Sequence, residues 1–220
     1  MSSVRDSEVR SGPDRYVSGV GVARRLSEYL SEYRNPQIVT GIGSGDAFLR
    51  YTGLSRFPVP SMRYDGSATT SNAHELAKRA AEAGADAIVG IGAGKLSDTV
   101  KNVAEELGCH MVMVPTLAAT CAAYSALSVN YDHMHRYVGS SMHRHNSDLV
   151  IVDAGLVATG PVDYLIGGIG DTLAKWYESA PVFAQSDSLS TFDLLAQQSA
   201  ALIRDILFAE SEAAVRSLRE

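Results

Sequence analysis

The chain has 220 residues, with 19 Lys and Arg against 25 Asp and Glu, so its formal net charge is −6. Hydrophobic residues make up 45% of it and charged residues 20%, a composition that excludes wholesale disorder. The acidic balance argues against nucleic acid or an anionic membrane as a partner, because both attract basic patches.

Cysteine usage and the lack of targeting signals indicate a cytoplasmic protein. Two cysteines, Cys109 and Cys121, make no disulfide framework, which is typical of a reducing compartment. No apolar run approaches the roughly 18 residues that span a bilayer, and the first residues are too polar for a secretory signal. We therefore expect a protein of the cytoplasm with no membrane partner.

The first half of the chain alternates short apolar runs with amphipathic segments. Helical spacing predicts helices over 20–33, from 46 onward, from 72 to 83 and over 95–107. Apolar runs that end in glycine or proline predict strands at 16–17, 37–40, 59–63, 86–92 and 110–114. This alternation is typical of βαβ units on a parallel sheet, so we expect a doubly wound α/β domain.

After Pro115 the pattern changes. A polar stretch between 127–131 and 136–138 indicates a β-hairpin, and 149–153 is one more strand. From Pro161 onward the pattern is helical, with helices expected over 162–179 and 188–209, a break at Pro181, and a last polar helix up to residue 220. The sequence thus predicts an α/β domain over residues 1–160 and the truncated beginning of an all-helical domain over residues 161–220.

The segment 89–101 leaves a strand, turns through Gly90, Gly92 and Gly94, and begins a helix. Such glycines let a diphosphate approach the backbone, and the N-terminus of the helix attracts its charge. The glycines match neither a Walker A loop nor the Rossmann GxGxxG spacing, and Leu96 stands where a Walker loop places Ser or Thr. Spacing alone leaves open a tight turn with Asp98 in the first turn of a helix.

Two later segments also carry polar candidates. Small and hydroxylated residues over 114–125 follow a strand, a place where open α/β sheets bind ligands. Cys121 lies among them and is more typical of a small buried residue than of a nucleophile. Asp171 lies in an apolar stretch whose periodicity points inward, so it needs a partner; a pair with Lys175, one turn on, is favoured over a metal.

Three motifs occur in order along the chain: 92–95 with Asp98 and Lys101, then 115–116 with 125–129, then 168–174. Their order and spacing resemble those of glycerol dehydrogenases, which belong to the iron-containing (metal-dependent) alcohol dehydrogenase family. The resemblance covers residues 12–180. Segments 120–123 and 170–178 are most similar to the hydroxycarboxylate dehydrogenase branch, whose members reduce 2-oxo acids such as 2-oxoglutarate with NADPH.

The resemblance implies a dehydroquinate synthase-like fold, with a nucleotide-binding domain at 1–160 followed by the start of a metal-binding helical domain. It implies NAD or NADP as cofactor, together with Zn²⁺ or Fe²⁺. The implied dinucleotide contacts are the diphosphate at Gly92, Gly94 and Lys95, the nicotinamide side at Asp98, Ser125, Leu127 and Tyr131, and the adenosine part at Thr116 and Ala119. Asp171 would be catalytic, as one ligand of the metal.

The sequence departs from the family pattern in two places near these contacts. Cys121 stands where glycerol dehydrogenases carry an aspartate that contacts substrate, which suits a substrate that brings its own carboxylate. Segment 40–44 lacks the acidic residue of NAD-type members, so NADP becomes admissible, with Asp46 as an alternative carboxylate.

The family's two metal-binding histidines come from beyond residue 220. The pairs His133/His135 and His143/His145 have strand spacing, which permits metal binding, but a polar hairpin tip is the favoured interpretation.

The resemblance implies an NAD(P)-dependent oxidoreductase that moves hydride, with metal assistance, between the nicotinamide and a small polyol or 2-hydroxy acid. The alternative is a catalytically incomplete module that binds a dinucleotide or another protein. In both cases the expected ligands are small molecules, such as an alcohol or a 2-oxo acid. We also expect a homo-oligomer or poor solubility, because helices after residue 160 would expose apolar faces if no further domain covers them.

Overall fold

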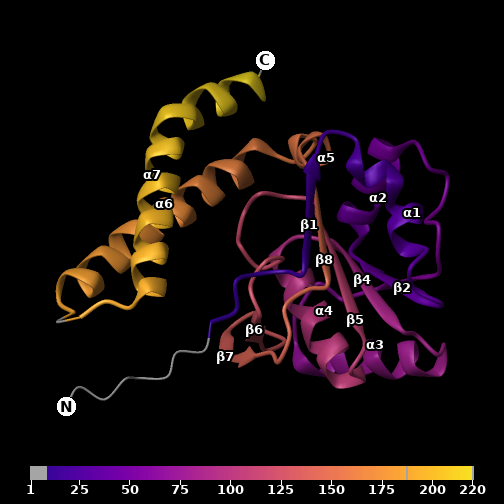
Figure 1. Cartoon of the computed structure of the whole chain (residues 1–220). Coiled ribbons are helices and arrows are strands. Elements are labelled where there is room, and N and C mark those ends of the chain that lie inside the picture. Colours follow the sequence, from indigo (N-terminus) through magenta and orange to yellow (C-terminus); the bar gives the residue numbers. More distant parts are fainter. Residues whose placement is uncertain (1–8, 187, 220) are drawn as a thin grey trace, which may run out of the picture.

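Six strands lie side by side in one parallel sheet, in the order β1-β8-β5-β4-β2-β3 (Figure 1). The computed structural model describes residues 9–186 and 188–219. The strands are β1 Arg15–Gly19, β2 Pro36–Thr40, β3 Ser61–Arg63, β4 Ala87–Gly92, β5 His110–Pro115 and β8 Leu149–Asp153. β2 and β4 are buried at every residue, as expected for apolar strands covered on both faces.

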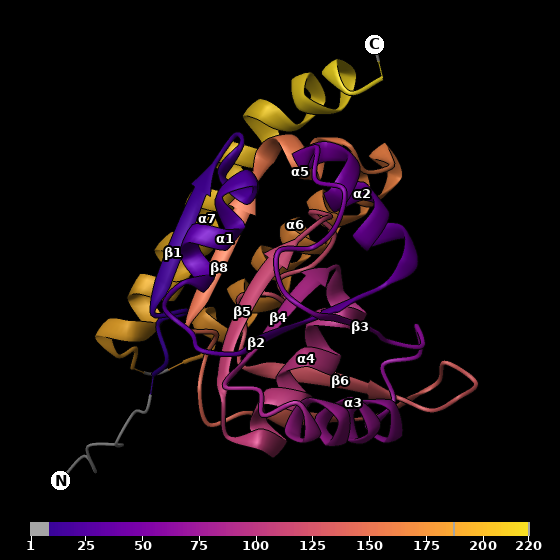
Figure 2. The same ribbon diagram turned by 90° about the vertical axis from the view of Figure 1, so that its right-hand side faces the viewer.

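Helices cover both faces of the sheet, which confirms the doubly wound α/β fold (Figure 2). On one face lie α3 Thr70–Glu82 and α4 Gly94–Leu107; on the other lie the 3-10 helix η1 Val22–Arg25 and helices α1 Leu26–Leu30, α2 Ile42–Thr52 and α5 Ala154–Ala158. Neighbouring residues of a strand pack into the hydrophobic cores on opposite faces of the sheet, because side chains alternate along a strand. Met113 packs into the core under α3 and α4, whereas Val112 packs into the other one.

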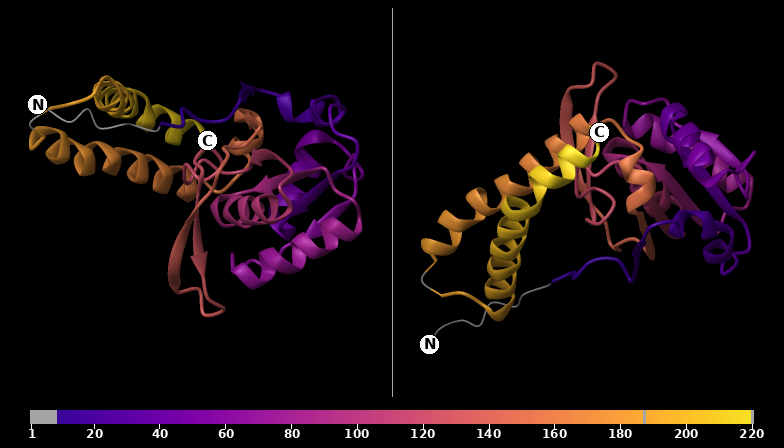
Figure 3. Two further views of the ribbon diagram at one scale, coloured as in Figure 1. Left: turned by 60° about the horizontal axis from the view of Figure 1, so that its bottom comes forward. Right: turned by 90° about the horizontal axis from the view of Figure 1, so that it is seen from above.

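The predicted hairpin is confirmed as β6 Leu127–Tyr131 and β7 Tyr137–Met142, an antiparallel pair outside the main sheet. It projects from the α/β body beside α4 (Figure 3, left). Its two strands carry some of the predicted cofactor contacts, so the position of the hairpin matters for the site.

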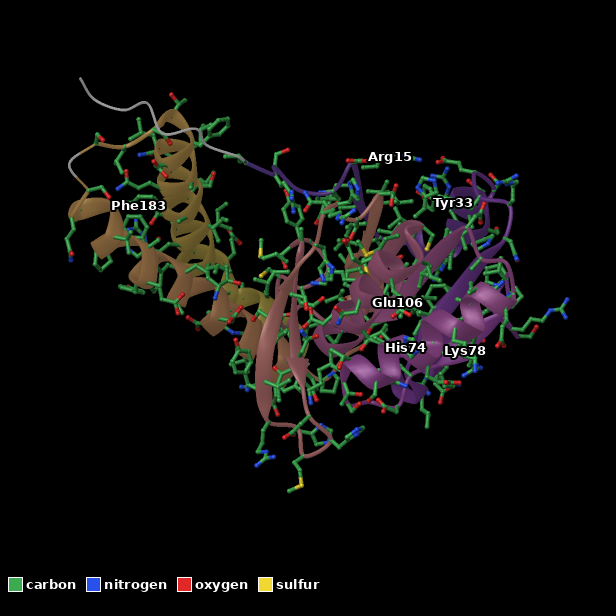
Figure 4. All side chains as sticks on the ribbon, turned by 90° about the horizontal axis from the view of Figure 1, so that it is seen from below. Arg15, Tyr33, His74, Lys78, Glu106 and Phe183 are labelled. Carbon is green, nitrogen blue, oxygen red and sulfur yellow. The ribbon has the colours of Figure 1, made fainter. Side chains whose placement is uncertain are left out.

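Two long helices, α6 Val162–Ala184 and α7 Thr191–Ser217, pack against each other and extend away from the sheet (Figures 1 and 3). Phe183 lies near the outer end of α6, far from His74 and Lys78 on α3 (Figure 4). Large apolar side chains of both helices are exposed, including Val182, Leu202 and Phe208. Within the described part of the chain, no helix combines the length and hydrophobicity needed to cross a bilayer.

Besides the start of α2, which lies at Ile42 rather than at residue 46, three predicted helix boundaries are wrong. The helix expected over 20–33 is a 3-10 turn followed by a short α1, because the buried Asp153 carboxylate accepts hydrogen bonds from the N–H groups of Gly21 and Ala23 and fixes that turn. Pro181 does not break α6, since it lies in the last turn and removes a single backbone hydrogen bond.

The third difference concerns the C-terminal helices. The segments expected as a helix over 188–209 and a separate polar helix form one helix, α7, which begins after a capping box at Ser190 and Asp193. Residue 220, the expected end of the last helix, lies outside the described residues.

Candidate functional site

The segments that follow β4 and β5 adjoin at the carboxyl edge of the sheet. Gly92 pairs with Pro115 in the last register position of these strands, so the two strands end level. The N–H of Thr116 donates to the carbonyl oxygen of Gly92 over 3.0 Å. Ligands of open α/β sheets bind at this edge, so the fold places the predicted contacts where such a site belongs.

The glycine bend between β4 and α4 packs closely against the loop after β5. Helix α4 begins at Gly94, and no side chain caps its N-terminus. A Cβ atom on Gly94 would lie 2.9 Å from Thr120 Oγ1, so a side chain there would crowd the bend. Asp98 is in the second turn of α4, which corrects the expectation that it follows the cap within the first turn. The first-turn N–H groups thus have no competing acidic side chain.

Lys95 joins the glycine bend to the hairpin. Its Nζ atom lies 5.0 Å from the centre of the Tyr131 ring and 3.4 Å from Nδ1 of His135. The structure therefore brings together two residues predicted to contact opposite parts of one dinucleotide. A cation over an aromatic face is attracted by the ring's quadrupole.

Asp98 forms a buried ion pair with Lys101. Their side chains are 9% and 0% exposed, and Lys101 Nζ lies 2.8 Å from Asp98 Oδ1. Burial raises the pKa of Asp98 and lowers the pKa of Lys101, while each partner's charge opposes the shift of the other. Lys101 also donates to the carbonyl oxygens of Ser125 and Leu127, both predicted nicotinamide contacts.

The loop between β5 and β6 carries the remaining predicted contacts. Ala119 and the exposed Cys121 both lie on this loop. Helix α6 touches the same loop at Gly168, where an added Cβ would lie 1.8 Å from the carbonyl oxygen of Ala118. Asp171 follows Gly168 by three residues along α6.

Three cavities, of about 480, 780 and 890 Å³, lie elsewhere. They are found between α6 and α7, around residues 49–61, and at the amino end of β5. None of the predicted dinucleotide contacts lines these three.

Comparison with known proteins decides the family. The sequence profile described as iron-containing alcohol dehydrogenase matches residues 13–154, which is more than half of the chain. The chain belongs to the iron-containing alcohol dehydrogenase family. The resemblance drawn from the three motifs is thereby confirmed.

The chain is 35% identical over 214 residues to hydroxycarboxylate dehydrogenase A of Escherichia coli (strain K12), covering 93% of this chain and 57% of that protein. It is 34% identical over 173 residues to a glycerol dehydrogenase of Thermotoga maritima, covering 76% and 47%. A probable glycerol dehydrogenase from Sinorhizobium meliloti 1021 has a similar structure, with a TM-score of 0.85 and 29% identity, covering 97% and 60%. The chain thus spans about half to three fifths of the length of these relatives.

The metal site of an iron-containing alcohol dehydrogenase is not formed by the described residues. Asp171 pairs with Lys175 over 3.6 Å, as the residues alone favoured, but its side chain is 42% exposed rather than buried. The inward periodicity misleads because α6 packs on α7 and one loop rather than on the sheet. Within the described ranges, no group of three or more His, Cys, Asp or Glu side chains is placed to hold a metal.

The histidine pairs do not act together. His133 and His135 lie at the exposed hairpin tip, while His143 is buried and its Nε2 atom lies 2.7 Å from Ser128 Oγ. The favoured interpretation of a polar hairpin tip therefore fits the first pair.

Sequence reasoning assigned no role to several residues that shape the site. Lys101 belongs to the first motif, and its spacing from Asp98 puts both on one face of α4, a signal that could have predicted their pairing. The contact of Gly168 with Ala118 and the bond of Ser128 to the backbone of α4 join distant segments, so no local pattern indicates them.

Proposed function

We propose that this chain is the NAD(P)-binding part of an oxidoreductase that transfers hydride between a nicotinamide and a small polyol or 2-hydroxy acid. The observation that carries the proposal is the uncapped N-terminus of α4, which follows a tight glycine bend beside Lys95 in a member of this family. In this proposal residues 1–160 bind the dinucleotide, and residues 161–220 begin a helical metal-binding domain.

The residues at the bend fit a diphosphate. Gly92 and Gly94 leave room for its oxygens to approach the N–H groups of α4, and Lys95 adds a positive charge. In this proposal Thr116 and Ala119 line the adenosine part. The nicotinamide is bordered by Asp98, Ser125, Leu127 and Tyr131. The bound dinucleotide supplies or accepts the hydride, and this chain's residues bind and orient it.

The end of β2 favours NADP(H) over NAD(H). Segment 41–45 holds no carboxylate, and Asp46 Oδ1 lies 4.0 Å from Nη2 of Arg63, so its charge faces that guanidinium. Arg63 also donates to the carbonyl oxygen of Gly41. An arginine here can receive a ribose 2′-phosphate, whereas an NAD site offers a carboxylate to the ribose hydroxyls.

Substrate and metal are proposed more coarsely. The exposed Cys121 brings no carboxylate to the substrate position, which favours an alcohol or 2-oxo acid that carries its own carboxylate. We propose Asp171 as one ligand of Zn²⁺ or Fe²⁺. The described residues do not fit a complete site for such an ion, so a functional metal requires ligands besides these. The exposed apolar faces of α6 and α7 favour a homo-oligomer.

The same observation supports a second candidate, a catalytically incomplete module that binds a dinucleotide without turning it over. This second function is favoured because the described residues form no group of His, Cys, Asp or Glu side chains that could hold a metal by themselves. Turnover of an alcohol or a 2-oxo acid with added Zn²⁺ separates the two functions, since the module binds the dinucleotide and shows no turnover.

Titration of the protein with NADPH and NADH, followed by dinucleotide fluorescence, tests the proposal. A Gly94→Val variant places its side chain against Thr120 and should abolish binding while the protein stays folded by circular dichroism. If Gly94→Val binds the dinucleotide as well as the unmodified protein does, the glycine bend has no part in binding.

A further inference from the structure

We propose that Lys101 is a positioning residue that shapes the nicotinamide end of the cofactor site by holding the hairpin and the preceding loop against α4. This inference rests on the proposed dinucleotide function. Lys101 touches no predicted phosphate or adenosine contact and acts through the segments that it holds.

The Lys101 side chain is fully buried, and its hydrogen-bond partners lie on the loop before β6 and on β6 itself. Its ammonium shares three protons among the Asp98 carboxylate and the carbonyl oxygens of Ala122, Ser125 and Leu127. The Ala122 oxygen lies 2.9 Å away and the Ser125 oxygen 3.3 Å away. A buried ammonium in contact with several carbonyls fixes the backbone that carries them, because each oxygen would otherwise lose a hydrogen bond in a dry place.

Further bonds between α4 and β6 act in the same direction. Ser128 Oγ donates to the Asp98 carbonyl oxygen over 2.9 Å, and the backbone of Val129 makes a small contribution that lowers the pKa of Asp98 against the larger effect of burial. Asn102 Nδ2 donates to Asn130 Oδ1 over 2.9 Å. Ser128 and Asn130 of β6 are thus hydrogen-bonded to α4, and Lys101 adds a charged contact to the same interface.

The geometry divides the site into two parts. The diphosphate end is formed by the glycine bend and the first turn of α4. Within the described residues, the hydrogen bonds of Lys101 go to other segments and not to this end. The nicotinamide end includes Ser125 and Leu127, whose carbonyl groups Lys101 holds directly. Loss of Lys101 should therefore loosen one end of the site and spare the other.

A comparison of two ligands tests this division. ADP-ribose carries the adenosine and the diphosphate without the nicotinamide, whereas NADH carries both ends. We expect Lys101→Met to bind ADP-ribose within about twofold of the unmodified protein and NADH about tenfold more weakly, a difference of about 1.4 kcal/mol. In turnover assays the KM for the dinucleotide should rise more than kcat falls.

Two further variants serve as a control and as a second test of the inference. Lys78→Met removes an exposed lysine of α3 and should change neither affinity. Ser128→Ala removes a neutral tie between β6 and α4 without leaving a buried charge unpaired, so it gives the same pattern on a smaller scale if Lys101→Met does not fold.

Equal weakening of ADP-ribose and NADH in both site variants would overturn the inference, as would unchanged NADH affinity in folded Lys101→Met. An unmodified protein that binds neither of these ligands and does not bind NADPH would instead refute the proposed function.

Discussion

The ammonium of Lys95 lies 5.0 Å from the centre of the Tyr131 ring, so the start of α4 and the end of β6 are in contact. In the proposed site Lys95 also serves the diphosphate, and its long side chain can reach either partner. A bound diphosphate and the Tyr131 ring therefore compete for one cation, and the charged partner should win.

Lys95→Ala should weaken dinucleotide binding by about tenfold, the loss expected for one charge-assisted contact. The dependence of affinity on salt should also flatten, because exposed charge pairs are screened by ions. Fluorescence titrations with NADH at low and high ionic strength measure both effects. Lys78→Ala on α3 is the matched control, and an equal loss in that variant would show a general effect of net charge.

Arg63 should discriminate between the two nicotinamide dinucleotides. Arg63→Ala is expected to raise the KM for NADPH by about tenfold and to change the KM for NADH by less than about twofold, since only NADPH carries the 2′-phosphate. The exposed Arg56, in the loop before β3, provides the control variant Arg56→Ala. A strong preference of the unmodified protein for NADH would refute the NADP reading of this edge.

Adjacent glycines of α6 should respond in opposite ways to the same substitution. A Cβ on Gly168 would lie 1.8 Å from the carbonyl oxygen of Ala118, whereas a Cβ on Gly167 would meet nothing within 4 Å. Gly168→Ala should therefore cost about 1–3 kcal/mol of unfolding free energy through overpacking. Gly167→Ala should stabilise the protein by up to about 1 kcal/mol through helix propensity. Denaturant unfolding compares them, and equal effects would mean that α6 does not dock on this loop.

Local patterns predicted most of the fold. Gly108, with φ of 61°, ends α4 where expected, because a left-handed residue at this place favours glycine. The apolar run of β4 likewise predicts a strand covered on both faces. What the sequence did not show depends on contacts between distant segments, such as the bonds of Asp153 to Gly21 and Ala23.

The same limit applies to the candidate site. Family motifs located its segments, but the three carbonyl oxygens that accept from Lys101 lie 21 to 26 residues away along the chain and follow from the folded loop alone. The exposure of Asp171 depends on how far α6 extends from the sheet, which periodicity does not record.

Asp171→Ala should separate metal-dependent turnover from cofactor binding. A lost metal ligand should reduce turnover stimulated by Zn²⁺ by about a hundredfold or more, because the ion's charge stabilisation is worth several kcal/mol. Dinucleotide affinity should stay within about twofold of that of the unmodified protein. Lys175→Ala removes only the exposed ion-pair partner and should change stability little. If Asp171→Ala loses both properties equally, the carboxylate has a structural role.

His143 should make the protein less stable as the pH falls below about 6.5, the ordinary pKa of histidine. Burial, and then the charge of Lys101, lower the pKa of His143 in the folded protein, while Glu105 opposes them. Between the lowered pKa of His143 in the folded protein and its ordinary pKa in the unfolded chain, the imidazole is protonated in the unfolded chain and neutral in the folded protein. Unfolding free energy should fall with decreasing pH in that window, by at most about 1.4 kcal/mol per pH unit.

Denaturant unfolding between pH 7 and pH 5 measures this slope above the range where solvent-exposed carboxylates take up protons, and comparison with the variants below removes the contribution of the buried Asp98. His143→Gln keeps an amide donor for Ser128 but cannot titrate, so its slope should be shallower than that of the unmodified protein. His133→Gln at the exposed hairpin tip should leave the slope unchanged, because that side chain is in contact with solvent in the folded protein as well as in the unfolded chain. Identical slopes in His143→Gln and the unmodified protein would show that the buried imidazole does not couple folding to protonation.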